Sequence, residues 1–105
     1  MATYCLVYKG GPGMAMSEAE QQAEMEKWGA WYGSLGDAVV DGGNPFGASA
    51  SVATDGTVTQ GGASGLTGYT MLAADSLDAA TAMAKGCPVL SSKGTVEVYE
   101  IVPVM

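Results

Sequence analysis

Few residues of this chain have side chains suited to catalysis, and the first group lies at residues 41–45. Asp41 and Asn44 flank two glycines that precede Pro45. A carboxylate and an amide near the end of a strand can orient a polar ligand, and burial could raise the pKa of Asp41 enough for it to act as a base. The same two residues also form turns by bonding nearby backbone. The segment is therefore either a polar anchor of a ligand site or a turn.

The second group is aromatic. Trp28, Trp31 and Tyr32 recur at helical spacing, and ligand sites are mostly apolar with a few polar groups. Such a stripe is equally typical of core or of a dimer interface. Tyr69 could hydrogen-bond a ligand or act as a general acid, or be a simple sheet residue. The candidate ligand-binding residues are Trp28, Trp31, Tyr32, Asp41 and Asn44, and the acid/base candidates are Asp41 and Tyr69.

Other chemistries find little support. The chain contains no histidine, so ligation of haem by histidine is excluded and a transition-metal site is not expected. The glycine loop at residues 61–65 leads into a predicted strand, whereas phosphate-binding loops open a helix. Ser64 in that loop has no histidine to activate it. We therefore expect no metal and no cofactor.

A helix must position the aromatic group. Ser17 and Glu20 form a capping box, which predicts a helix from there to about Leu35. Gly29 and Gly33 lie inside it, and each costs the helix ~1 kcal/mol relative to alanine. Close packing by another segment would account for both glycines.

A second helix is predicted near residue 80. Asp75 or Ser76 caps it, and Leu77, Ala80 and Ala84 are expected to face inward. Runs typical of strands occupy residues 3–8, 38–41, 48–54, 57–60, 68–73 and 95–102, with a hairpin signal at Asp55-Gly56. The order β-α-β-β-β-α-β is an elaborated ferredoxin-like pattern. It predicts one α+β domain over residues 1–105, with an antiparallel sheet and both helices on one face.

The uncovered face of that sheet should be apolar. Tyr4, Leu6 and Tyr8 alternate with Cys5 and Val7, so both faces of the first strand carry apolar or aromatic side chains. Charged residues make up only 14% of the chain, well below the usual ~25%. We therefore expect the uncovered face to bury against a second copy in a symmetric homodimer.

Charge and cysteine content limit the partners and the compartment. Four lysines against eleven acidic residues give a net charge of −7, and nucleic-acid binding needs a basic patch that is missing here. No signal peptide and no apolar run long enough to cross a membrane is apparent. Cys5 and Cys87 are most simply buried thiols, which is consistent with a cytoplasmic protein.

The chain resembles the YCII-related (DGPF-type) proteins of the dimeric α/β-barrel superfamily. The resemblance is carried by Trp28, Trp31, the Asp55-Gly56 hairpin and residues 4–8, 40–45, 67–69, 74–79, 84–88 and 96–98. It implies a homodimer whose two sheets pack face to face, with a cleft between sheet and helices. Some relatives are described as enzymes with a His–Asp pair, which cannot be carried over because this chain has no histidine. It also lacks an Asp-Gly-Pro-Phe tetrapeptide.

Three functions remain open. The first is binding of a small, partly apolar molecule in a cleft between the first helix and the sheet. The second is an isomerase- or lyase-like enzyme that uses Asp41 or Tyr69 as acid or base. The third is an interaction module without a ligand site. An open cavity favours the first function, and a deep pocket with a carboxylate of perturbed pKa favours the second. A pocket filled by Trp28 and Trp31 themselves favours the third.

Overall fold

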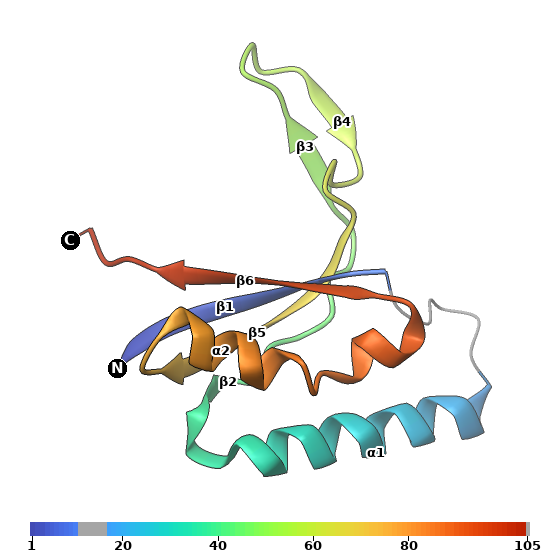
Figure 1. The fold of residues 1–105 in the computed structure, drawn as a ribbon. Coiled ribbons are helices and arrows are strands. Elements are labelled where there is room, and N and C mark those ends of the chain that lie inside the picture. Colours follow the sequence, from blue (N-terminus) through green and yellow to red (C-terminus); the bar gives the residue numbers. More distant parts are fainter. Residues whose placement is uncertain (11–16, 105) are drawn as a thin grey trace.

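The computed structural model describes residues 1–10 and 17–104, and its fold is α+β (Figure 1). The elements in chain order are β1 (Ala2–Lys9), α1 (Glu18–Leu35), the 3-10 helix η1 (Gly36–Ala38), β2 (Val39–Asp41), β3 (Ala50–Val52), β4 (Val58–Gln60), β5 (Leu66–Ala74), α2 (Leu77–Ala84), the 3-10 helix η2 (Pro88–Ser92) and β6 (Thr95–Ile101). Four strands lie between the two long helices, one at each of the predicted runs 38–41, 48–54, 57–60 and 68–73, whereas the predicted order counted only three strands there.

The main sheet is antiparallel and has the strand order β2-β5-β1-β6. Without the hairpin, this is the 2-3-1-4 arrangement of a ferredoxin-like fold, as predicted. The central strand β1 pairs Leu6 with Thr70 of β5 and with Val98 of β6. Both helices cover the same face of the sheet (Figure 1).

The helix ends follow the local sequence. Ser17 accepts a hydrogen bond from the backbone of Glu20, and the Glu20 side chain accepts one from Ser17, so the predicted capping box is present. Ser76 caps α2 through the backbone of Ala79. Ala80 of α2 is buried as expected, but the expectation that Leu77 faces inward is wrong, because 51% of it is exposed.

The glycines inside α1 are a second correction. A Cβ at Gly29 or Gly33 would meet no described atom within 4 Å outside the backbone of its own helix. Neither position is therefore required by close packing.

The core lies between the sheet and the helices. Leu6 and Leu72 are fully buried at its centre, together with Trp31, Cys87 and Val89. A smaller cluster around Tyr4 and Ala80 joins α2 to the other end of the sheet. The core thus fixes α1 against β1 and β5, the strands that border the site described below.

The opposite face of the sheet has no covering element among the described residues (Figure 1). Its side chains alternate with the buried ones along each strand and are half-buried or exposed. By the strand pairings they are Thr3, Cys5 and Val7 of β1, Tyr69, Met71 and Ala73 of β5, and Glu97, Tyr99 and Ile101 of β6. We call these nine residues the open face.

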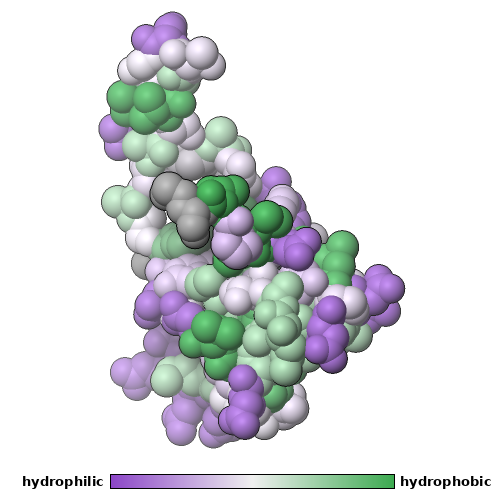
Figure 2. Space-filling view, turned by 90° about the vertical axis from the view of Figure 1, so that its left-hand side faces the viewer, coloured by the Kyte–Doolittle hydropathy of each residue, from purple (hydrophilic) through white to green (hydrophobic). Residues whose placement is uncertain are grey.

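The β3–β4 hairpin stands apart from the main sheet. Within the described chain, its two strands pair only with each other, and it rises on the side of the open face (Figure 1). Val52 and Val58 are 70% and 58% exposed, and Figure 2 shows hydrophobic surface on this projection near its tip. The radius of gyration is 15.0 Å, against about 13 Å for a compact domain of this length.

Candidate functional site

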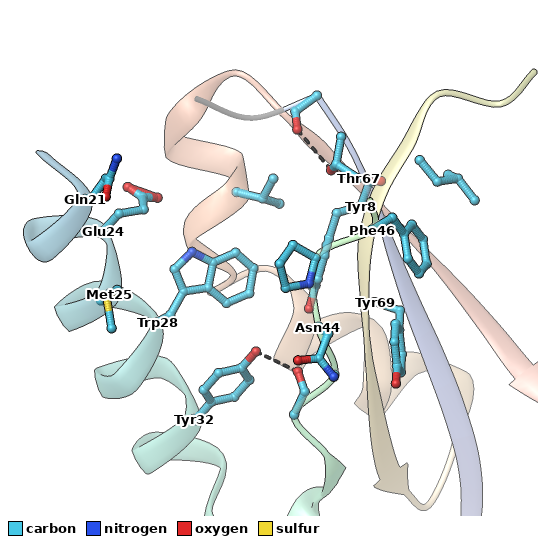
Figure 3. Close-up of a pocket in the computed structure, with 16 residues that line it drawn as sticks. Tyr8, Gln21, Glu24, Met25, Trp28, Tyr32, Asn44, Phe46, Thr67 and Tyr69 are labelled. Carbon is cyan, nitrogen blue, oxygen red and sulfur yellow. Dashed lines mark hydrogen bonds between the residues drawn. The ribbon is translucent and has the colours of Figure 1, made fainter. Parts of the chain in front are cut away.

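An open cleft of about 780 Å³ lies between α1 and the edge of the sheet. This volume is typical of small-molecule sites, which span about 300–1,000 Å³. Figure 3 shows Trp28 and Tyr32 projecting from α1 towards the segment that carries Asn44. The described lining residues are Tyr8, Gly10, Gln21, Glu24, Met25, Trp28, Tyr32, Gly42, Gly43, Asn44, Pro45, Phe46, Leu66, Thr67, Tyr69 and Val89.

One face of α1 forms the first wall. Gln21, Met25, Trp28 and Tyr32 follow each other three or four residues apart, and Glu24 precedes Trp28 by four, so all five share that face. Met25 lines the cleft and is nevertheless 73% exposed, because the cleft opens to solvent beside it.

Aromatic rings meet at steep angles at the base of this wall. Tyr8 and Trp28 lie 5.2 Å apart between ring centroids with an interplanar angle of 72°. Trp28 and Trp31 lie 5.7 Å apart at 78°, and Trp28 and Tyr32 lie 5.9 Å apart at 43°. Edge-to-face pairs stabilise a cluster beyond simple burial. Trp28 is therefore held in place by its neighbours and does not fill the cleft.

A chain of hydroxyl groups forms the floor. The Tyr8 hydroxyl donates to Thr70 Oγ1 over 2.5 Å, and Thr70 Oγ1 donates to the Gly42 carbonyl over 3.0 Å. The Tyr32 hydroxyl donates to the same carbonyl over 2.8 Å. Burial is the main cause that raises the pKa of Tyr8 well above its usual range and also raises the pKa of Tyr32. Both phenols are therefore neutral near pH 7 and make no general base there.

Cys87 lies beside this floor and is unreactive for the same reason, because burial keeps its thiol protonated. Burial, with a smaller contribution from the negative charge of Glu24, raises the pKa of Cys87 to about 11. A thiol is nucleophilic only as the thiolate. Cys87 therefore acts as core, in agreement with its assignment as a buried thiol, and both cysteines are free.

Residues 42–46 form the second wall. Gly43 has φ of +76°, and a Cβ there would lie 1.7 Å from the Tyr69 carbonyl oxygen, so only glycine fits. The segment is tied to β5 by the bridge between Pro45 and Gly68 and by the Phe46 amide, which donates to the Thr67 carbonyl over 2.9 Å. These backbone contacts place Asn44 on the cleft.

The structure brings three of the five ligand-binding candidates to the cleft: Trp28, Tyr32 and Asn44. Trp31 lies behind them in the core, where its indole N–H donates to the Met83 carbonyl over 3.0 Å. Its helical spacing is right, but packing against Met83 at the end of α2 and against Gly86 turns it inward.

Asp41 lies on the open-face side of the sheet edge. A register shift in β2 pairs Val39 with Leu72 but Asp41 with Met71, so Asp41 does not share the inner face with Val39 as regular alternation would require. Its carboxylate is exposed, and Oδ1 accepts a hydrogen bond from the Gly43 amide over 2.9 Å. Of the two interpretations of residues 41–45, a polar anchor or a turn, this hydrogen bond corresponds to the turn.

The two acid/base candidates do meet. The Tyr69 hydroxyl donates to Asp41 Oδ2 over 3.4 Å, and the Tyr69 ring stacks on Phe46 with centroids 5.8 Å apart. Tyr69 and Phe46 lie at the rim of the cleft, on the side away from Trp28 (Figure 3).

Sequence reasoning missed most of the lining residues, and Tyr8 and Glu24 are the two that matter most for the chemistry of the cleft. The alternation in residues 4–8 predicts only a strand position for Tyr8, and no sequence motif singles out Glu24. The spacing of α1 could have found Glu24, because it precedes Trp28 by four residues and so lies on the same face. Nothing local could have found Tyr8, whose partners Thr70 and Trp28 lie far away in sequence.

The glycine loop at residues 61–65 lies beside a separate, shallower depression. The depression has a volume of about 480 Å³ and lies at the base of the hairpin. Ser51 and Ser49 bond the backbone of this loop. The loop leads into β5, not into a helix, so no helix N-terminus is available to hold a phosphate.

Within the described residues, no three side chains of His, Cys, Asp or Glu type lie close enough to hold a metal ion. In the same residues, no helix has the length and apolar character needed to cross a membrane.

Comparison with known proteins gives the family. No curated protein matches the chain significantly. A family model for the YCII-related domain matches residues 1–105. Its match to the whole chain agrees with the resemblance seen in the sequence and with the ferredoxin-like sheet. The chain therefore belongs to the YCII-related family.

Proposed function

We propose that this protein binds a small, partly apolar molecule in the cleft between α1 and the sheet. The observation that carries the proposal is an open cavity of about 780 Å³ bordered by Trp28, Tyr32 and Asn44. Trp28 and Tyr32 supply apolar contact area, and the Asn44 amide can fix the orientation of a polar group. An interaction module without a ligand has no need for such a cavity.

Trp31 and Asp41 support this site from outside the lining. Trp31 packs behind Trp28 and limits its movement. Asp41 bonds the Gly43 amide and so orders the turn that presents Asn44. Both residues belong to the proposed site as positioning residues.

The test is a screen of small aromatic and aliphatic compounds by saturation-transfer NMR. Compounds that bind the cleft should lose most of their signal with Trp28→Ala and keep it with Leu90→Ala. Leu90 is a suitable control because it is also apolar and partly exposed but does not line the cleft. The absence of any compound that separates the two variants would count against the proposal.

We also propose that the protein is a cytoplasmic homodimer formed through the open face. Its apolar residues, among them Cys5, Val7 and Met71, are the feature that favours a partner of the same kind. The hairpin rises beside this face (Figure 1), and an isolated two-stranded hairpin is marginally stable in water. A second copy seated in the corner between them would cover both. Two free cysteines suit a reducing compartment.

An isomerase- or lyase-like activity is the second candidate, and one observation favours it. Asp41 and Tyr69 are in hydrogen-bond contact at the rim of the cleft, so a carboxylate and a phenol could act together on a ligand held there. Once a ligand is known, Asp41→Asn should abolish its conversion while leaving its binding unchanged. Loss of binding alone would assign Asp41 only to the turn.

A further inference from the structure

The charge of the cleft comes from one side chain. Among the described lining residues, only Glu24 is charged, and its side chain is 16% exposed. Residues 11–16 of the sequence, Gly-Pro-Gly-Met-Ala-Met, carry no charge. Among the described lining residues, a bound anion therefore meets no cationic side chain, whereas a bound cation meets a carboxylate.

The aromatic rings add to this preference. Glu24 lies one helical turn before Trp28 on the same face of α1. Tyr8, Trp28 and Tyr32 border the same cavity and are not parallel to one another. Cations bind to the faces of such rings, and desolvation strengthens the attraction. An ammonium group above Trp28 would therefore lie on the face of α1 that also carries the Glu24 carboxylate.

The two phenol groups at the floor of the cleft have no proton available to donate to an anion. The hydroxyl protons of Tyr8 and Tyr32 are already donated to Thr70 and to the Gly42 carbonyl. An anion would have to break these bonds to be solvated by the floor. A cation needs acceptors, and phenol oxygens keep acceptor capacity while they donate.

Two features of α1 oppose the preference, and both are weak. Lys27 Nζ lies 4.0 Å from Glu24 Oε2, but the lysine is 56% exposed and does not line the cleft. Exposed pairs of this kind contribute little. The N-terminus of α1 attracts anions in general, but here Ser17 and Glu20 already cap it, and Glu18 and Glu20 add negative charge to its first turn.

We infer that the cleft selects organic cations, that is, quaternary or protonated amines carried on an aromatic or apolar body, over anions and neutral molecules of the same shape. This inference rests on the proposed function, because it names the ligand class of the same cleft. Glu24 is the residue that determines the choice, and Trp28 is the ring that receives the cation.

The test compares three probes that share a phenol ring: 4-hydroxyphenyl-trimethylammonium, its neutral isostere 4-tert-butylphenol, and 4-hydroxybenzoate. Dissociation constants are measured by calorimetry and by quenching of tryptophan fluorescence. The cation should bind about five- to tenfold more tightly than the neutral isostere, which corresponds to a cation–π contact with partial desolvation. The benzoate should bind most weakly of the three.

Two variants assign the selectivity to Glu24. Glu24→Gln should bring the affinities of the cation and the neutral isostere close together, while Glu26→Gln should not, because Glu26 is exposed on the same helix and does not line the cleft. Lys27→Gln should strengthen binding of the cation, because it removes the ammonium group that competes with the ligand for the Glu24 carboxylate. This increase is a readout that a folding defect could not produce.

The outcomes separate this inference from the proposed function. Equal binding of the cation and the neutral phenol to the unmodified protein would overturn the inference and still support a ligand cleft. Preferred binding of benzoate would overturn it as well. Failure of all three probes to affect tryptophan fluorescence would count against both.

Discussion

At the scale of single residues, the site depends on a few side chains whose places are set by contacts far along the chain. Trp28 and Trp31 are three residues apart, yet one lines the cleft and the other donates its indole proton to Met83 in the core. Thr70 accepts a hydrogen bond from the Tyr8 hydroxyl and donates one to the Gly42 carbonyl. Substitutions at neighbouring positions should therefore have very different effects.

Gly43→Ala should destabilise the protein by more than ~3 kcal/mol, because the left-handed backbone and a contact with the Tyr69 carbonyl both exclude a Cβ. Urea unfolding followed by circular dichroism measures the change. Gly29→Ala is the matched control, since its Cβ meets no described atom outside its own helix backbone. It should stabilise the protein by ~1 kcal/mol through helix propensity. Equal effects of the two substitutions would contradict the position of the 42–46 segment.

Stability should fall in alkaline solution because of the buried thiol and phenols. The pKa of Cys87 rises from 9.0 to about 11 on folding, so the folded state holds a proton that the unfolded state releases in this window. The stabilisation is complete below pH 9 and is lost as the pH rises towards 11. Tyr8, whose pKa is also raised by burial, adds a further loss from pH 10.0 upward.

The measurement is urea unfolding of the reduced protein at several values between about pH 8 and pH 10.5. Cys87→Ala should be less stable throughout but should lose less stability across the window than the unmodified protein. Parallel pH profiles for the two proteins would show that Cys87 does not hold its proton more tightly when folded.

At the scale of elements, local signals in the sequence were sufficient for the boundaries of the two helices, whereas the strand predicted at residues 48–54 spans only Ala50–Val52. The capping box at Ser17 and the cap at Ser76 have the geometry that their residues predict. The Asp55-Gly56 hairpin is present, but its loop has three residues where Asp-Gly predicts two, because the Ala53 amide donates to the Thr57 carbonyl and only Gly56 in the loop has a positive φ. These features depend on neighbours within four residues. The ferredoxin-like order could be predicted for the same reason, because it follows from the succession of elements.

Features that depend on long-range contacts could not be predicted from the sequence. The register shift that moves Asp41 to the open-face side depends on how β2 pairs with β5. The exposure of Leu77 depends on how α2 lies on the sheet. Trp31 is drawn inward by the chain near Met83, 52 residues away. Periodicity defines a stripe on a helix, but only packing decides which part of the stripe faces a cavity.

The hairpin is the element with the fewest ties to the rest of the molecule. Replacement of residues 49–62 by a short glycine-serine linker should leave the main sheet folded, since β3 and β4 pair only with each other in the described chain. The far-UV circular dichroism should keep its helical signal, and the deleted protein should still unfold cooperatively. Loss of cooperative unfolding would show that the hairpin belongs to the core.

At the scale of the whole molecule, the shape points to assembly. Both helices cover one face and the hairpin projects beside the other (Figure 1). Most side chains of that other face are apolar or aromatic, with Thr3 and Glu97 as the exceptions. The extents of 44 × 43 × 18 Å describe a flat, open form. A second copy on the open face would make the assembly more compact and bury apolar side chains at about 25 cal/mol per Å².

Met71→Lys should shift the protein from dimer to monomer, because it places a charge at the centre of the proposed interface. Light scattering coupled to size-exclusion chromatography gives the mass directly. Leu77→Lys is the matched control, as it adds the same charge at an exposed apolar residue on the helical side. A dimer that survives Met71→Lys, or a monomeric unmodified protein, would rule out this interface.

The cleft itself is tested most directly by the two indole N–H signals in a proton–nitrogen NMR spectrum. The chain has two tryptophans, and Trp28→Phe assigns the signals. Titration with a compound found in the screen should move the Trp28 signal saturably, whereas the signal of Trp31, buried and bonded to Met83, should move much less. If saturating ligand leaves the Trp28 signal unmoved, or shifts Trp31 more than Trp28, the cleft beside α1 is not the binding site.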